Sequence, residues 1–417
     1  MDFSLDARTD ELRATMLDFM DEVVYPAEST FHEQLSQLDD RWAWDSTPII
    51  GHLRSEARKR GLWNLFLPGD HAGVEGAGLT NLQYAHLAEI SGRSIHLAPP
   101  AMNCAAPDTG NMEVLHLFGT AEQKKTWLEP LLDGRIRSAF AMTEPDVASS
   151  DATNIELSIV RDGDEYVLNG RKWWITGAMN PNCRIFIVMG KTDPSASRHR
   201  QQSMVLVPRD TPGLTVVRGM EVYGYDDHEH GGHAELVFDD VRIPVGNLIG
   251  EEGGGFGIAQ ARLGPGRIHH CMRSIGIAER AIEMMCERAD SRIAFGRPLA
   301  DQGVVRTWLA ESRVKIEQLR LLVLKTAWLM DTVGNKGAHT EIQAIKIATP
   351  QTVQEILDTA IQLHGAAGLS QDLPLANMAA GIRTLRFADG PDEVHKSALG
   401  KAELARQAER RRAASAT

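Results

Sequence analysis

Cysteine is scarce in this chain of 417 residues, and membrane-length apolar segments are missing. The four cysteines (Cys104, Cys183, Cys271 and Cys286) include no pair at CxxC spacing. This usage argues against a disulfide framework or a cysteine-based zinc site, and it predicts reduced, mostly packed thiols. No apolar run approaches the length of a membrane span, so we expect no spanning helix.

Positive charge is also in short supply. Lysine and arginine total 44 against 56 aspartates and glutamates, which gives a formal net charge of −12. Phosphate backbones need concentrated positive charge, so we expect no nucleic-acid partner, although local arginines could still hold a small anion. The first residues are acidic and lack an apolar core, which predicts a cytoplasmic protein without a secretion or transit signal.

Two familiar ligand motifs are absent as well. The glycine-rich run at 250–257 has the wrong spacing for G-x-G-x-x-G and precedes a helix, so a dinucleotide would not sit on a Rossmann unit. His228, His230 and His233 follow two aspartates, but their spacing fits no known zinc pattern. We therefore predict no metal site and read this segment as a loop lining a substrate cleft.

The patterns that are present run in the order helical, β, helical. Apolar spacing predicts helices over Arg8–Val24, ended by Pro26, and over Pro48–Arg60. Further helices are expected from Thr80 to Ile90, from Asn111 to Phe118 and from Ala121 to Leu132. We expect three domains, with a helical domain at 1–136, a small β-domain at 137–248 and a helical bundle at 249–417.

The β-domain is predicted from short runs rich in β-branched and aromatic residues. These runs are Ser138–Met142, Glu156–Arg161, Tyr166–Asn169, Arg184–Gly190, Met204–Val207 and Ala234–Phe238. Asp162-Gly163-Asp164 predicts a hairpin turn. The long amphipathic segments that follow predict an antiparallel bundle, with Pro350 kinking one helix. A crevice between domains is the default place for a ligand.

Two segments carry residue types suited to a flat polar ligand. Phe140–Asp151 runs from a strand into a loop dense in hydroxyls and small residues, which lets backbone N–H groups approach a ring edge or a pyrophosphate. Arg171–Ala178 places two tryptophans beside a threonine, a combination that suits a heteroaromatic cofactor. Taken singly, hydroxyls in loops usually cap and tryptophans on strands usually pack.

A third segment, Arg383–Lys396, reads as helix, break, helix. Gly390-Pro391 interrupts the apolar pattern, and a new helix begins with Pro391 and two acidic residues in its first turn. Asp389 sits at the start of that helix, where free N–H groups keep a carboxylate ionised and able to act as a base. By itself this motif is more often a simple turn than a catalytic site.

The ordered set of motifs resembles the acyl-CoA dehydrogenase family over essentially the whole chain. The motifs are Gly119–Lys124, Trp127–Leu132, Met142–Pro145, Trp174–Thr176, Arg292–Gly296, Gln362–Gly368 and Asp389-Gly390. Variants around 145–151, 263–273 and 388–395 resemble the subgroup that includes eukaryotic members fused to a phosphotransferase-like domain and their bacterial single-domain relatives. The resemblance implies an α+β fold with a helical domain, a barrel-like β-sheet domain and a C-terminal four-helix bundle.

The resemblance also implies roles for individual residues. Asp389 falls at the catalytic carboxylate. FAD would meet Phe140, Met142, Thr143, Ser149, Trp174, Ile175, Thr176, Arg292, Phe295, Gln362, Gly365, Ala366, Pro391 and Glu393. Substrate would meet Ser149, Asp151, Gly266, Arg267 and Gly390. Arg292, Phe295, Gln362, Gly365 and Ala366 would serve a neighbouring subunit, which implies a homodimer or a dimer of dimers.

The sequence departs from the family pattern in four places. The base is aspartate where most members have glutamate, so the carboxylate arm is one methylene shorter. Gly266 occupies a position where some members carry their base. Ala366 stands where a second glycine is usual, and Gln302 is one residue short of the usual glutamine spacing, so Gln302 is not assigned.

The implied reaction is α,β-dehydrogenation of an acyl-CoA to a trans-2-enoyl-CoA, as in β-oxidation. An α-proton beside a thioester is weakly acidic, so it needs a positioned carboxylate, and FAD supplies the electron chemistry. Electrons would pass to an electron-transfer flavoprotein. The alternatives are a flavin-dependent acyl-CoA or nitroalkane-type oxidase on the same scaffold, and a catalytically inactive homologue that serves as a binding protein.

Overall fold

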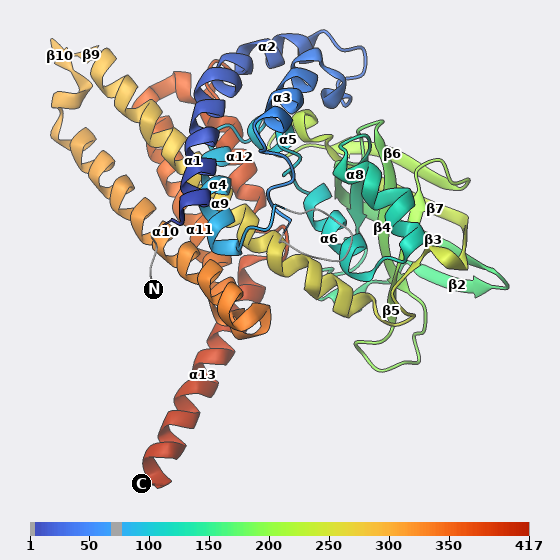
Figure 1. Cartoon of the computed structure of the whole chain (residues 1–417). Coiled ribbons are helices and arrows are strands. Elements are labelled where there is room, and N and C mark those ends of the chain that lie inside the picture. Colours follow the sequence, from blue (N-terminus) through green and yellow to red (C-terminus); the bar gives the residue numbers. More distant parts are fainter. Residues whose placement is uncertain (1–4, 68–76, 417) are drawn as a thin grey trace. The chain divides into compact units, whose positions relative to one another are not determined.

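The structure is a computed structural model that describes residues 5–67 and 77–416, and the chain forms two compact units (Figure 1). The helical unit comprises Met1–Leu17, Leu79–Ala98 and Arg267–Thr417. The sheet unit comprises Asp18–Gly78 and Pro99–Gly266. Each unit therefore combines segments that lie far apart in the sequence.

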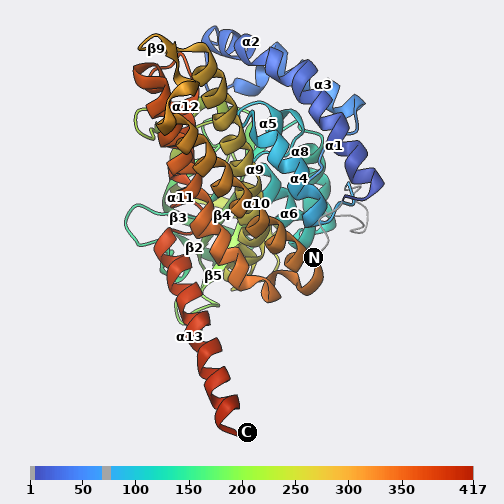
Figure 2. The ribbon, with the colours of Figure 1, turned by 90° about the vertical axis from the view of Figure 1, so that its left-hand side faces the viewer.

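The helical unit is built around long helices joined by short connections (Figure 2). Its main elements are α1 (Ala7–Phe19), α4 (Asn81–Gly92), α9 (Gly255–Ser291, which begins in the sheet unit), β9 (Ile293–Ala294), β10 (Arg297–Pro298), α10 (Gly303–Gly337), α11 (His339–His364), η8 (Gly365–Leu369), α12 (Leu375–Thr384) and α13 (Asp392–Ala416). Helix α11 packs against α10, α12 and α13, and α10 also packs against α4. In both views the C-terminal half of α13 extends away from the other helices.

Local signals in the sequence fix the start of α4. The Thr80 hydroxyl accepts a hydrogen bond from the Gln83 backbone N–H, and Gln83 bonds back to the Thr80 N–H, which completes a capping box. Helix α4 then crosses α9 closely, because a Cβ added at Gly276 would lie 1.9 Å from the Glu89 carbonyl oxygen. Only glycine permits this approach of two helix backbones.

The sheet unit surrounds one eight-stranded sheet. Its strands are β1 (Arg137–Ala141), β2 (Ser158–Asp162), β3 (Glu165–Thr176), β4 (Cys183–Lys191), β5 (Gln202–Pro208), β6 (Leu214–Met220), β7 (His233–Pro244) and β8 (Leu248–Ile249). The order is β6-β7-β3-β2-β4-β5-β8, and β1 pairs with β4 in parallel. One face packs a core that includes Ile159, Leu168, Ile175, Phe186 and Val207.

Helices and irregular turns flank this sheet. The elements are η1 (Met20–Val24), α2 (Tyr25–Ser36), α3 (Pro48–Lys59), α5 (Ala98–Ala101), α6 (Asp108–Phe118), α7 (Ala121–Gln123), η3 (Lys124–Leu128) and α8 (Glu129–Leu132). No helix in the described part of the chain has both the length and the apolar character that crossing a membrane requires.

Several local predictions are confirmed. Helix α3 spans Pro48–Lys59, one residue from the expected end. The hairpin turn also forms, with Asp162 paired to Glu165 and Gly163 at a φ of 64°. A two-residue turn with positive φ matches the twist of the flanking strands.

Other local predictions are wrong. The first helix does not end at Pro26, because a π-helical turn leads directly into α2, and Pro26 lies in the first turn of α2, where a missing N–H costs little. By contrast, the predicted helix through Pro350 does form, because α11 runs from His339 to His364 with Pro350 inside it. Strand β6 was not predicted, although its alternation of exposed and half-buried residues is that of an edge strand.

Candidate active site

Asp389 lies in the break between α12 and α13, as the sequence predicts. Asp389 and Gly390 both have positive φ, at 56° and 106°, and α13 begins at Asp392 just after Pro391. Aspartate tolerates this left-handed region better than most residues, and glycine adopts it freely. The break therefore has a defined, sharply turned backbone.

Side chains of α9 meet this break. Arg267 Nε donates to the Asp389 carbonyl oxygen at 3.0 Å. His270 Nε2 lies 3.8 Å from Asp389 Oδ2, and the Asp389 side chain is 14% exposed. Burial lowers the pKa of Arg267, and the negative charge of Asp389 opposes that shift. The structure thus brings together three predicted residues, Arg267, Asp389 and Gly390, within the helical unit.

A second group of predicted residues gathers in the sheet unit, where the end of β1 meets β3. The Trp173 backbone N–H donates to the Thr143 carbonyl at 3.0 Å. Lys172 Nζ donates to the Met142 carbonyl at 2.7 Å and to Glu144 Oε1 at 2.8 Å. These bonds join the hydroxyl-rich loop to the tryptophan strand.

Trp174 is turned away from the regular strand by a register shift. The pairing of β3 with β7 is irregular between Lys172 and Ile175, and Trp174 has a φ of 54° and is 40% exposed. Ile175 is 1% exposed and belongs to the sheet core, so only its backbone is available to a ligand. The Thr176 hydroxyl lies 3.0 Å from His233 Nδ1.

The loop after β1 is largely self-supporting. The Ser149 hydroxyl accepts from the Glu144 N–H at 2.9 Å. Asp151 accepts from the Thr153 N–H at 3.0 Å and pairs with Arg198 at 2.7 Å. These bonds match the ordinary capping reading of such a loop, and they fix its backbone in place. Phe140, on β1 before this loop, lies 4.1 Å beneath the Arg262 guanidinium.

Predicted residues assigned to a neighbouring subunit are exposed in this chain. Phe295 lies between β9 and β10, has a φ of 52° and is 98% exposed. The other exposed positions of this group are Arg292, Gln362, Gly365 and Ala366, and Glu393, assigned to the chain's own FAD, is exposed as well. Pro391 and Gly266 are half-buried. Gln302, left unassigned, accepts from Arg297 at 3.3 Å and precedes α10.

Sequence reasoning missed the buried pair that organises the sheet-unit group. Lys172 and Glu144 are 0% and 6% exposed, and Glu144 also accepts from the Glu156 and Leu157 backbone N–H groups, each at 2.8 Å. Burial lowers the pKa of Lys172 to about 8, and Glu144 opposes that shift. A lysine next to two tryptophans gives no sequence signal that it is buried.

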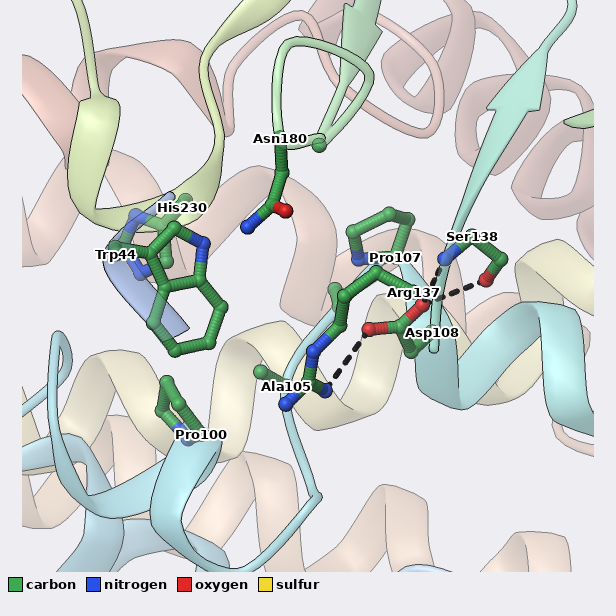
Figure 3. Close-up of a pocket in the computed structure, with 11 residues that line it drawn as sticks. Trp44, Pro100, Ala105, Pro107, Asp108, Arg137, Ser138, Asn180 and His230 are labelled. Carbon is green, nitrogen blue, oxygen red and sulfur yellow. Dashed lines mark hydrogen bonds and ion pairs between the residues drawn. The ribbon is translucent and has the colours of Figure 1, made fainter. Parts of the chain in front are cut away.

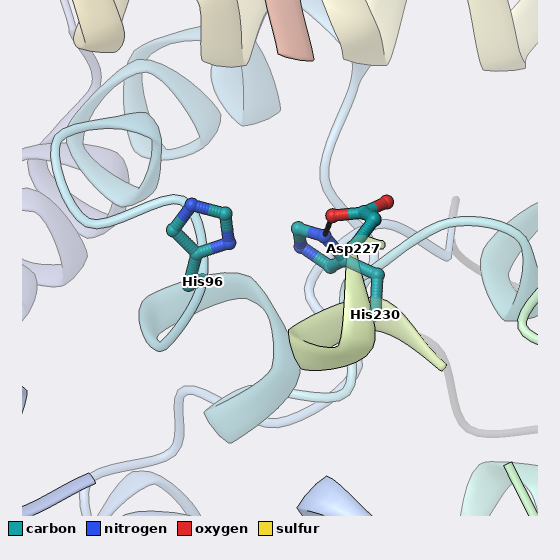
Figure 4. Close-up of side chains that lie close together, drawn as sticks. All are labelled: His96, Asp227 and His230. Carbon is teal, nitrogen blue, oxygen red and sulfur yellow. Dashed lines mark hydrogen bonds and ion pairs between the residues drawn. The ribbon is translucent and has the colours of Figure 1, made fainter. Parts of the chain in front are cut away.

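Three histidines of this segment each have a ring nitrogen beside an aspartate oxygen. Figure 4 shows Asp227 beside His230, whose Nδ1 lies 2.8 Å from Asp227 Oδ1. His233 Nε2 lies 3.2 Å from Asp227 Oδ2. The pKa of Asp227 lies well below its usual range because these two imidazoles outweigh the large opposing effect of burial. His233 therefore links Asp227 to Thr176.

A small pocket in the sheet unit lies apart from the predicted residues. Trp44, Pro100, Pro107 and His230 contribute to its lining, and Arg137 bonds Asp108 at 3.2 Å beside it (Figure 3). None of the predicted catalytic, cofactor or substrate residues lines this pocket. Its charged groups serve mainly to join α6 to β1, since Asp108 also accepts from the Ser138 N–H at 2.7 Å.

Comparison with known proteins decides the family. Acyl-CoA dehydrogenase domain profiles match almost the whole chain, with the N-terminal domain at residues 6–135, the middle domain at 139–241 and the C-terminal domain at 253–404. The chain belongs to the acyl-CoA dehydrogenase family. The family resemblance and the three-part fold predicted from the sequence are thereby confirmed.

Individual relatives support the predicted subgroup. The chain is 54% identical over 409 residues to "Probable acyl-CoA dehydrogenase FadE2" of Mycobacterium tuberculosis, covering 98% of each chain. It is 56% identical over 396 residues to human "Acyl-CoA dehydrogenase family member 11", covering 94% of this chain but 50% of that protein. The chain thus spans about half the length of this vertebrate relative.

A solved structure from Mycobacterium abscessus, described as a "putative acyl-CoA dehydrogenase", has the same fold. It superposes with a TM-score of 0.92 at 51% identity and covers 97% of this chain and 100% of that one. Members of this family are FAD-dependent oxidoreductases, and this chain is one of them.

The side chains of the sheet unit fit a flavin. Trp174 offers an exposed aromatic face, and the Thr176 hydroxyl is two residues away on the same strand. A flat ring with polar edges needs this combination of stacking and hydrogen bonding. The register shift in β3 is what makes the Trp174 face available.

Proposed function

We propose that this protein catalyses the α,β-dehydrogenation of an acyl-CoA thioester to a trans-2-enoyl-CoA, with Asp389 as the base that takes the α-proton. The observation that carries this proposal is the position of Asp389. Its half-buried carboxylate lies at a helix break, and Arg267 Nε donates to the Asp389 carbonyl oxygen at 3.0 Å. A carboxylate fixed in this way can meet a weakly acidic proton without first losing conformational freedom.

The remaining roles follow the residues described above. FAD, when bound, accepts the hydride that leaves the β-carbon. Met142, Thr143, Trp174 and Thr176 would hold the flavin ring, with Phe140, Ser149 and the Ile175 backbone beside them. The residues proposed for the rest of the cofactor are Arg292, Phe295, Gln362, Gly365 and Ala366 of a second copy, together with Pro391 and Glu393.

Proton removal is the step that this chain's own residues perform. Asp389 has a short side chain, so the position of its carboxylate depends closely on the backbone of the break. Arg267 would hold that backbone and the thioester end of the substrate, and the other proposed substrate contacts are Ser149, Asp151, Gly266 and Gly390. We further propose a role in β-oxidation, an electron-transfer flavoprotein as electron acceptor, and assembly as a homodimer or a dimer of dimers.

The test is Asp389→Asn, which keeps the shape of the side chain and removes the base. We expect the variant to retain FAD and bind acyl-CoA, while anaerobic bleaching of the flavin by a panel of acyl-CoA thioesters slows by about 10³-fold. Asp372→Asn, at an exposed position in the same unit, is the matched control and should bleach at the wild-type rate. Bleaching of Asp389→Asn near the wild-type rate would show that another group is the base.

Two further outcomes of the same assay bear on the function. Rapid reoxidation of the reduced flavin by oxygen alone would identify an oxidase instead of a dehydrogenase. Purified protein that retains no FAD after supplementation would identify an inactive homologue.

A further inference from the structure

The break that carries Asp389 is also held from α11 and α13. Lys346 Nζ, from α11, donates to the carbonyl oxygens of Leu385 and Gly390, the latter at 3.4 Å. His395 Nε2, from α13, lies 3.0 Å from the same Gly390 oxygen. With Arg267 on the Asp389 carbonyl, donors from three helices converge on one short turn.

Lys346 is an unusual choice for this structural position. Lys346 is 1% exposed, and the two groups that accept its hydrogen bonds are neutral carbonyl oxygens. Burying an ammonium group is costly unless a negative charge compensates it. Burial lowers the pKa of Lys346, and the negative charge of Asp389 is the strongest influence that opposes this shift. The buried cation and the carboxylate therefore attract one another through the turn.

We propose that Lys346 is a positioning residue for Asp389: its hydrogen bonds fix the left-handed turn, and its charge holds the carboxylate in the ionised form that accepts a proton. This inference rests on the proposed function, because it assigns Lys346 a role only if Asp389 is the base. Lys346 itself touches neither substrate nor cofactor in the proposal.

The groups of α9 that face Asp389 contribute in different ways. Arg267 is a permanent cation, and its guanidinium is bonded to the Asp389 backbone. His270, 3.8 Å from the carboxylate, changes charge when it titrates. Cys271 stays neutral, because burial raises its pKa to about 11. Lys346 and Arg267 are therefore the constant positive charges, and His270 is the variable one.

Two titratable groups of α13 lie near this turn, one neutral and one ionised. His395 is neutral, because burial, together with Arg267 and Lys346, lowers its pKa to about 4. Asp392 is engaged elsewhere, accepting from Gln351 at 3.0 Å and from Arg386 at 2.8 Å. Loss of the Lys346 charge should therefore make Asp389 easier to protonate.

The experiment compares three substitutions at Lys346 in the FAD-loaded enzyme. Lys346→Met removes charge and donors, Lys346→Gln removes the charge but keeps an N–H donor on a side chain one atom shorter, and Lys346→Arg keeps both charge and donors. For Met and Gln we expect the acid limb of the kcat–pH profile to move up by about one pH unit. At pH 7 we expect kcat to fall about 10-fold or more for Met, with KM nearly unchanged. Lys346→Arg should restore the wild-type profile.

Controls separate this effect from folding and from His270. Lys401→Met, at an exposed position on α13, should leave the profile and the melting temperature unchanged. The kcat–pH profile of His270→Asn is measured alongside. A limb of the wild-type profile that is missing from this variant is caused by titration of the His270 imidazole. Circular dichroism and FAD absorbance establish that each variant is folded and loaded.

Each outcome decides one question. If Asp389→Asn is inactive but folded Lys346→Met and Lys346→Gln keep the wild-type pH profile, the assignment of Lys346 is wrong and the proposed function stands. If Asp389→Asn turns over at the wild-type rate, Asp389 is not the base, and the proposed function is wrong whatever the result at Lys346. If both neutral variants fail to fold while Lys346→Arg folds, Lys346 serves stability rather than the base, which also overturns the assignment.

Discussion

Glu113 illustrates how burial alone changes the chemistry of a residue. It lies inside α6, is 8% exposed, and its Oε2 has no hydrogen-bond partner among the described residues. Burial raises its pKa to about 8, and the charge of Arg262 opposes the shift. The same physics acts on Lys346 with the opposite sign, because burial always disfavours the charged form. For Glu113 and Lys346, desolvation is thus the largest effect on the pKa, and a neighbouring charge opposes it.

A pH-dependent stability follows from Glu113. Because its folded pKa is raised above the usual 4.5, its contribution to stability is complete below about pH 4.5 and is lost as the pH rises through about 8. Glu113→Gln removes this titration. Between pH 5 and pH 8 we expect the free energy of unfolding to fall by about 3 kcal/mol more in wild type than in the variant. Urea unfolding across this range measures the difference. Glu122→Gln, at an exposed position, is the control, and identical slopes for Glu113→Gln and wild type would contradict the prediction.

At the scale of elements, the sheet-unit site depends on how β1 and β3 are joined. The loop after β1 carries the hydroxyls, β3 carries the tryptophans, and the buried Lys172–Glu144 pair connects them at 2.8 Å. The irregular register of β3 then turns Trp174 outward beside Thr176. The positions of the residues proposed to hold the flavin therefore depend on bonds made by their neighbours.

Lys172→Met should disrupt this connection. The substitution leaves the Glu144 carboxylate buried without its cation, which costs about 3–5 kcal/mol when one partner of such a pair is removed. We expect a lower unfolding free energy in urea and a lower FAD-to-protein absorbance ratio after purification. Arg161→Met, on the exposed end of β2, should change neither quantity. A stability loss below about 1 kcal/mol would mean that the pair does not organise the loop.

At the scale of the whole molecule, large apolar side chains remain on the surface of the helical unit. Phe295 is 98% exposed on the β9–β10 hairpin, and Leu369 and Phe387 are 71% and 61% exposed. Apolar side chains of this size at a hairpin tip favour association, since water gains entropy when they are covered. A net charge of −12 opposes nonspecific aggregation through these surfaces.

Phe295→Ser tests whether the hairpin serves a second copy of the chain. If Phe295 packs on a neighbouring subunit and its cofactor, the variant should dissociate at a concentration where wild type stays associated, and it should lose FAD more readily. Light scattering after size-exclusion chromatography and flavin absorbance measure the two effects. Val160→Ser, at a 58% exposed position on β2, controls for loss of surface apolarity. An unchanged mass and FAD content would refute the role of the hairpin.

Much of the local structure could be predicted from the sequence, because local structure depends on neighbouring residues. Thr80 and Gln83 start α4, Gly163 makes the hairpin, and Gly390 breaks the helix, each through chemistry within a few residues. The errors have a different origin, because packing and weak apolar patterns cannot be recognised from neighbouring residues. A π-helical turn before Pro26 depends on packing around that segment, and an edge strand such as β6 carries only a weak apolar pattern.

The sequence by itself determined the family, the order of helical and β segments, and Asp389 as the candidate base. Only the tertiary structure decided what surrounds that base. Arg267 and Asp389 are 122 residues apart in the chain, and Lys346 and Gly390 are 44 apart, yet both pairs share hydrogen bonds. Periodicity reports which face of a helix is buried, but the partner of a buried charge depends on which distant helix packs there. For this reason Asp389 could be found from its own turn, whereas Lys346 could be recognised only in the folded unit.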